Sequence, residues 1–87
     1  MKITKRIQNI VERANNARFN QAIYFLKSQD KTISEQERIA SETFDNVFSG
    51  QWTAYVESLM MLGVDIDNDV KLDSWDESLQ MAELHLK

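Results

Sequence analysis

The chain has 87 residues, which is enough for one domain and too few for two, so we expect a single domain over residues 1–87. Its 43% hydrophobic and 28% charged residues are typical of globular proteins, and the absence of cysteine excludes disulfides, thiolate metal sites and cysteine nucleophiles. The net charge is −4, no apolar run approaches the ~20 residues of a membrane span, and no signal segment is recognisable, so we expect a cytoplasmic protein.

Apolar residues at a helical period predict a long first helix over residues 3–27. A second stripe on another side of this helix is formed by Phe19, Ile23 and Leu26, which follow each other at i, i+4 and i+7. A helix that is apolar on two sides is either central in the core or partly reserved for a partner. Arg18 lies within the main apolar face, and we interpret it as a snorkelling side chain or as an anchor for a partner.

Capping boxes and glycines predict three further helices. The segment 34–37 starts one helix, which Gly50 ends; a helix over residues 52–62 follows and ends at Gly63; the segment 74–77 starts the last helix. The sequence therefore predicts an all-α fold, a small bundle or irregular array of about four helices.

Apolar residues of the middle helices are expected to form the core. In the first of them they are Ile39, Ala40, Phe44, Val47 and Phe48. In the second, the spacing of Trp52, Leu59 and Met60 is also typical of a buried face. We expect Trp52 and Trp75 to be core residues as well.

Charge divides unevenly along the chain. Residues 1–27 carry a net +5 and residues 28–87 a net −9. A polar stripe on the first helix contains Lys2, Arg6, Asn9, Arg13, Asn20 and Lys27. Such a stripe can follow phosphates, so nucleic-acid binding through the basic first helix is one alternative. We instead expect a solvated face that the acidic helices partly neutralise, and no nucleic-acid partner.

Five aspartates lie between the last two predicted helices, at Asp65, Asp67, Asp69, Asp73 and Asp76. The segment resembles the calcium loop of EF-hand and dockerin proteins, with carboxylates at loop positions 1, 3, 5, 9 and 12. The resemblance covers these twelve residues, and Val70 replaces the usual turn glycine. It implies a calcium site as one alternative. The same aspartates together with Glu77 form a negative patch that would attract a basic partner surface.

No catalytic constellation is recognisable. The one histidine, His85, lies near the C-terminus, and no phosphate-binding glycine loop is present. We therefore expect neither an enzyme nor a cofactor-binding protein.

We expect instead a regulator or inhibitor, of the kind that phages and other mobile elements encode, which binds another protein through an acidic surface. The residues that we expect at this contact are Asp65, Asp67, Asp69, Asp73, Asp76, Glu77, Arg18, Phe19 and Ile23. The first alternative is a homo-oligomer, which would bury the stripe of Phe19, Ile23 and Leu26 against a second copy.

Overall fold

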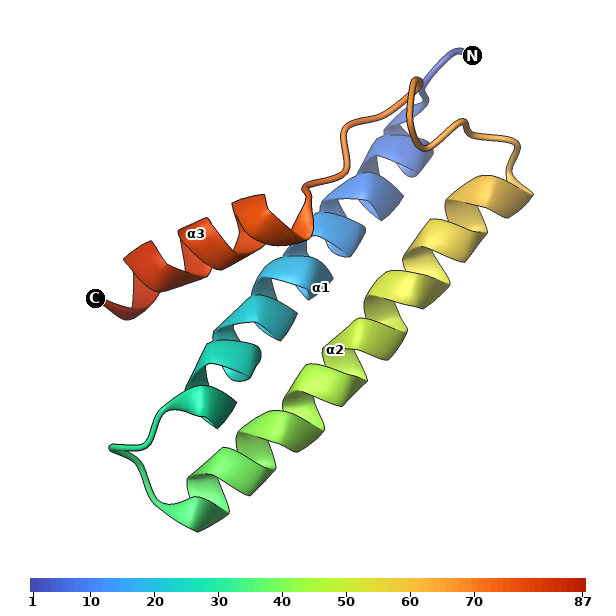
Figure 1. Ribbon diagram of the computed structural model, residues 1–87. Coiled ribbons are helices and arrows are strands. Elements are labelled where there is room, and N and C mark those ends of the chain that lie inside the picture. The colour runs from blue at the N-terminus through green and yellow to red at the C-terminus, as the bar shows by residue number, and fades with distance from the viewer.

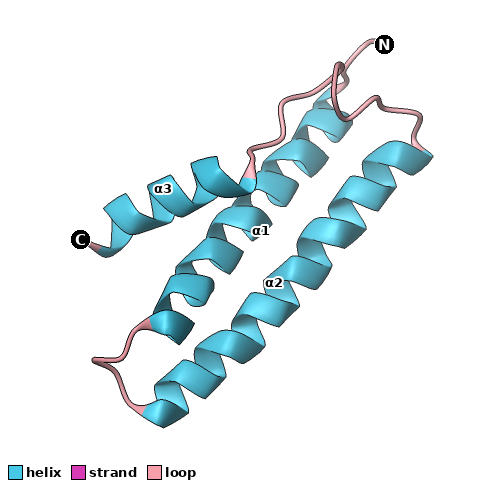
Figure 2. Ribbon diagram, viewed as in Figure 1, coloured by secondary structure: helices cyan, strands magenta, loops and turns pink.

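The computed structural model describes all residues from 1 to 87 and contains three helices and no strand (Figures 1 and 2). Helix α1 spans Lys5–Gln29, α2 spans Glu35–Met61 and α3 spans Trp75–Leu86. Helices α1 and α2 form a long antiparallel hairpin, and α3 returns across α1 (Figure 1). The all-α class is confirmed, but the number of helices is three instead of about four. By length and hydropathy, none of the three qualifies as a membrane-spanning segment.

The predicted helix starts at Ser34 and Ser74 are confirmed. The Ser34 hydroxyl accepts a hydrogen bond from the Glu37 amide at 3.1 Å. The Ser74 hydroxyl accepts one from the Glu77 amide, and the Glu77 carboxylate accepts one from the Ser74 amide, which completes a capping box. These bonds satisfy amide groups that have no partner within the first helical turn.

Gly50 does not end a helix, contrary to the sequence prediction. It lies inside α2, and its φ is not positive. One glycine costs a helix only about 1 kcal/mol relative to alanine, which the packing of the flanking turns on α1 offsets. The two helices predicted over residues 34–50 and 52–62 are therefore one continuous helix of 27 residues.

Gly63 does end α2, as predicted. Its φ is +79°, its amide donates to the Met60 carbonyl, and the Val64 amide donates to the Leu59 carbonyl. This is a Schellman motif, and the apolar contact that accompanies it joins Val64 to Leu59 in the core.

We expect opposite effects when the two glycines are replaced by alanine. Gly50→Ala should stabilise the protein by about 0.5–1 kcal/mol, because no atom lies within 4 Å of the added Cβ and the helix gains propensity. Gly63→Ala should destabilise it by about 1–2 kcal/mol, because alanine is strained at positive φ. Urea unfolding followed by circular dichroism measures both. A loss of stability in Gly50→Ala would show that α2 is not continuous there.

The core consists of two small clusters on α1. The first contains Ile7, Val11, Leu59 and Val64, and lies between α1, the end of α2 and the following loop. The second contains Ala22, Ile23 and Ala82, and lies between α1 and α3. Helix α3 packs against α1 and not against α2. Part of α2 is therefore left without a covering helix.

A long-range clamp fixes the loop between α2 and α3. The side-chain amide of Asn15 donates to the Lys71 carbonyl at 3.2 Å, and its oxygen accepts from the Asp73 amide at 2.9 Å. The Asn15 side chain thus satisfies the Lys71 carbonyl and the Asp73 amide, the backbone groups on either side of Leu72. These bonds hold the loop against α1 just before α3 begins.

Candidate functional site

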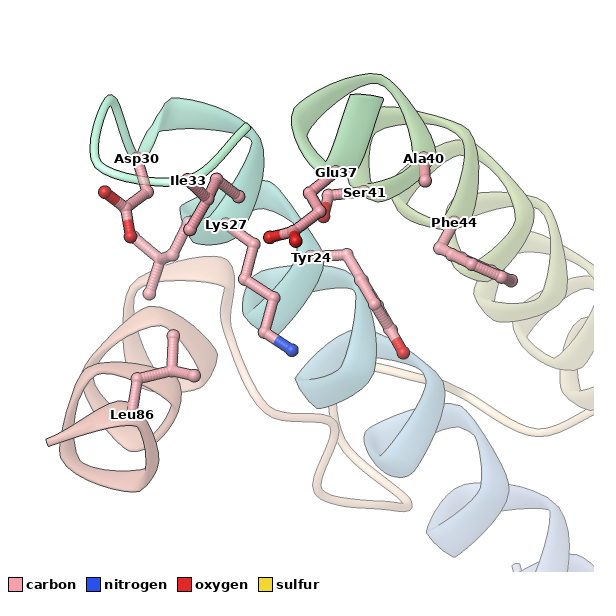
Figure 3. Close-up of a pocket in the computed structure, with 10 residues that line it drawn as sticks. Tyr24, Lys27, Asp30, Ile33, Glu37, Ala40, Ser41, Phe44 and Leu86 are labelled. Atoms are coloured by element: carbon pink, nitrogen blue, oxygen red, sulfur yellow. The ribbon is translucent and has the colours of Figure 1, made fainter. Parts of the chain in front are cut away.

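An apolar groove of about 400 Å³ lies at the end of the molecule where α1 is joined to α2 (Figure 3). Six of its ten lining residues are hydrophobic: Tyr24, Leu26, Ile33, Ala40, Phe44 and Leu86. Among the polar residues are Lys27, Asp30 and Glu37. The wall thus comes from α1, from α2, from the loop between them and from the end of α3. An apolar depression with a few polar groups is typical of a binding pocket.

The groove continues onto a side of α2 that no helix covers. Ala40, Phe44 and Val47 lie at i, i+4 and i+7, and we call these three residues the α2 flank. Phe44 is 48% exposed and Val47 is 47% exposed, although the sequence placed both in the core. Their spacing is the same as that of core residues. They remain exposed because α3 packs on α1 and does not cover this side of α2.

Aromatic rings connect the α2 flank to α1. The ring of Tyr24 lies 5.0 Å from that of Phe44 and 5.7 Å from that of Phe48, between ring centroids. The Lys27 ammonium lies 5.3 Å from the Tyr24 ring. These contacts fix the aromatic wall of the groove in one arrangement, which lowers the entropic cost of binding there.

Arg18 lies between the two tryptophans of the chain. Its guanidinium carbon is 3.8 Å from the centre of the Trp52 ring and 5.3 Å from that of the Trp75 ring. It donates to the Gln21 side chain at 3.0 Å and has no carboxylate partner. Burial lowers the pKa of Arg18 from its usual range. Arg18 therefore joins all three helices by cation–π contacts within the monomer, where the sequence suggested a snorkelling side chain or a partner anchor.

Phe19 and Ile23 are also used within the monomer. Ile23 is buried against Ala82 of α3, and Phe19 and Leu26 pack on the same cluster. The Phe19 ring makes an edge contact with His85, at 5.6 Å between centroids. The stripe that the sequence offered for a partner or a second copy is therefore covered by α3.

The acidic loop holds its own shape with its carboxylates. One Asp65 oxygen accepts from the Asp67 and Asn68 amides, and the other accepts from the Asn68 side chain at 2.8 Å. Asp69 accepts from the Asp65 amide and lies 3.7 Å from the amino group of Met1. These bonds turn the loop without a glycine.

The five aspartates of the calcium interpretation are not brought together. No group of three or more carboxylate or imidazole side chains is arranged to hold a metal ion. The amide of Asp73 is bonded to Asn15, and Asp76 lies exposed in the first turn of α3. Glu77 is paired with Lys71 at 3.1 Å, so three of the expected partner-binding acids, Asp65, Asp69 and Glu77, have intramolecular side-chain bonds.

Asp65 of the loop and Glu77 of the first turn of α3 have lowered pKa values, so we expect the free energy of unfolding to depend on pH in the acidic range. Hydrogen bonds from Asn68 and from the Asp67 amide lower the pKa of Asp65, and the Lys71 ammonium with Ser74 lowers that of Glu77. A carboxylate whose pKa is lower in the folded state stabilises the fold above its unfolded pKa, which is about 4, and this contribution is lost as the pH falls further.

We therefore expect the urea midpoint to fall between about pH 5 and pH 3, and to fall less in Asp65→Asn, which keeps an acceptor oxygen but cannot titrate. Asp67→Asn is the matched control, because the Asp67 side chain accepts no hydrogen bond. Equal acid sensitivity in Asp65→Asn and the wild type would contradict the role assigned to Asp65.

The basic stripe on α1 makes no ion pair with the acidic parts of the chain. The protein has two ion pairs, Met1 with Asp69 and Lys71 with Glu77, and neither includes a side chain of the stripe. The expected partial neutralisation of this face by the acidic helices therefore involves no direct ion pair. The stripe is an open, positively charged face on a protein of net charge −4.

Comparison of the chain with protein families, with curated proteins and with solved structures finds no match.

Proposed function

We propose that the protein is a non-enzymatic regulator or inhibitor that binds another protein through the apolar groove and the α2 flank. The observation that supports this best is the half-exposure of Phe44 and Val47 on a side of α2 that has no helix over it. Burying such side chains against a partner contributes about 25 cal/mol per Å² of apolar surface. Burial of these side chains would therefore stabilise a complex with a protein partner.

The residues that line the groove are of the types found in protein–protein interfaces. The aromatic and aliphatic side chains, among them Phe44 and Tyr24, line the groove together with the charged residues Lys27, Asp30 and Glu37. Protein interfaces concentrate their binding energy in apolar or aromatic anchors that a polar rim surrounds. Figure 3 shows Lys27 and Glu37 between Ile33 and the ring of Tyr24, with Leu86 across from α2.

Charge favours a partner with a basic surface. Helix α2 carries five carboxylates and one arginine, and none of them takes part in an ion pair. Unpaired carboxylates beside an apolar site speed the encounter with a positively charged partner and disfavour acidic ones. We therefore propose a partner that presents an apolar segment flanked by lysine or arginine.

The proposal is tested by affinity purification from the host lysate with two matched double variants. Phe44→Ser with Val47→Ser removes the α2 flank, and Met61→Ser with Leu84→Ser removes two apolar side chains that are even more exposed but lie outside the groove. The wild type and the control should retain the same protein, and the flank variant should retain at least tenfold less, since an interface anchor contributes over about 1 kcal/mol.

Equal retention by the flank variant and the control would contradict the proposal. Light scattering at micromolar concentration separates the homo-oligomer from it. A dimer that the flank variant abolishes would make a second copy the occupant of the groove in place of another protein.

A further inference from the structure

A second cleft, of about 500 Å³, lies along α1 at the opposite end from the apolar groove. Its lining consists of Lys5, Arg6, Asn9, Ile10, Arg13 and Tyr55. Five of these residues belong to α1, and Tyr55 belongs to the second half of α2. We call it the basic cleft, because three of its six residues are cations and none is an acid.

The cations of the basic cleft have no partner in the chain. Lys5, Arg6 and Arg13 form no ion pair, although the chain contains fourteen carboxylates. The first turn of α1 contains no acidic residue, whereas the first turns of α2 and α3 each contain two. The positive end of the α1 dipole therefore adds to the charge of the cleft without an acid in its own first turn, and Asp69 of the acidic loop is paired with the nearby Met1 amino group.

The shape of the basic cleft favours a strand with bases over a compact anion. Arg6, Asn9 and Arg13 lie at i, i+3 and i+7, so their side chains follow one line over about 10 Å of helix. Tyr55, half-buried beside this line, supplies an aromatic ring, which the basic stripe lacked in the sequence. Single-stranded nucleic acid is bound by this combination of cations that follow the backbone and rings that stack on bases.

We propose that the basic cleft binds single-stranded nucleic acid, with Lys5, Arg6 and Arg13 on phosphates and Tyr55 against a base. Lys2, an exposed cation that precedes α1, extends the track beyond the N-terminal end of the helix. This activity uses a different surface from the apolar groove and does not depend on the proposed protein partner.

The test is fluorescence anisotropy with the full chain and four labelled probes: a 12-nucleotide oligo(dT), a 12-nucleotide oligo(U), a 12-base-pair duplex and an acidic peptide. We expect micromolar affinity for the single strands at low salt, and a slope of about −2 for log K against log salt, from three phosphate contacts. Duplex and acidic peptide should bind at least tenfold more weakly.

Three variants assign the contacts. Arg6→Gln with Arg13→Gln should weaken binding at least tenfold and bring the salt slope to about −0.7. Tyr55→Leu should weaken it about fivefold or more and leave the slope unchanged, because stacking is not an ionic contact. Lys31→Gln with Lys87→Gln, which removes two exposed cations outside the cleft, should leave most of the affinity.

Several results would overturn the proposal. They are no binding of any single strand at 50 µM protein and about 50 mM salt, equal loss in the arginine variant and the lysine control, or preference for the duplex or the acidic peptide. Circular dichroism of each variant shows whether its helix content equals that of the wild type. Should Tyr55→Leu lose helicity, Tyr55→Phe, which keeps the ring, should bind as the wild type does.

Discussion

Leu59→Ala should destabilise the protein by about 3 kcal/mol, within the 2–5 kcal/mol typical of a leucine deleted from a packed core. Leu59 is fully buried, and it joins Ile7 and Val11 of α1 to Val64 beyond the end of α2. A chain of this size has a total stability of roughly 4–13 kcal/mol, so a considerable part of it depends on this side chain.

The matched control for Leu59→Ala is Met61→Ala, two residues further along the same helix. Met61 is 87% exposed, and its replacement should change the free energy of unfolding by less than about 0.5 kcal/mol. Urea unfolding followed by circular dichroism measures both variants. Similar losses in the two variants would mean that the end of α2 does not pack as described.

Arg18→Ala should cost about 2–3 kcal/mol of stability, and it should change the fluorescence of both tryptophans. The alanine removes two cation–π contacts of about 0.5–2 kcal/mol each, together with the packing of the arginine stem between Trp52 and Trp75. Because the chain has no other tryptophan, the emission spectrum reports this junction alone.

Two further variants separate charge from shape at Arg18. Arg18→Lys keeps the charge but loses the planar stack, and we expect about half of the loss. Arg13→Ala removes an exposed arginine from another side of α1, and we expect a change below about 0.5 kcal/mol and an unchanged emission spectrum. If Arg18→Ala and Arg13→Ala behave alike, the contacts of Arg18 with the tryptophans do not stabilise the fold.

Local signals in the sequence were sufficient to predict most helix ends. Ser34, Ser74 and Gly63 act on amides and carbonyls within one helical turn, so their effect can be recognised without knowing the fold. Gly50 has the same local signal as Gly63. It fails as a stop because its neighbours on both sides pack on α1, and that packing depends on tertiary structure.

The surfaces were harder to predict than the helices. Phe44 and Phe19 both lie in apolar stripes at helical spacing, and the sequence left open whether the Phe19 stripe faces the core or a partner. In the structure Phe19 packs against the core and Phe44 is half-exposed, because α3 lies on the Phe19 side of the hairpin. That position depends in part on Asn15, whose bonds to the loop span more than fifty residues of chain. Periodicity contains no information about such a contact.

The partners of individual charges could not be predicted from the sequence. The division into a basic first helix and an acidic remainder suggested a solvated face that is partly neutralised, and it did not indicate that the stripe on α1 forms no ion pair. The acids of the loop bond to amides of the loop itself, as Asp65 does. Short-range bonds of this kind form at little entropic cost, so they compete well with distant ion pairs.

The most direct test of the account is the reactivity of single cysteines, which the cysteine-free chain allows. Val47→Cys places a thiol on the α2 flank, and Ala22→Cys places one in the fully buried contact between α1 and α3. We predict that the Val47→Cys thiol reacts with a maleimide nearly as fast as a free thiol, and that the Ala22→Cys thiol reacts at least 100-fold more slowly, since it requires local opening. Protection of Val47→Cys in the isolated protein, or equal rates at the two positions, would contradict a fold in which α3 covers α1 and leaves the α2 flank open.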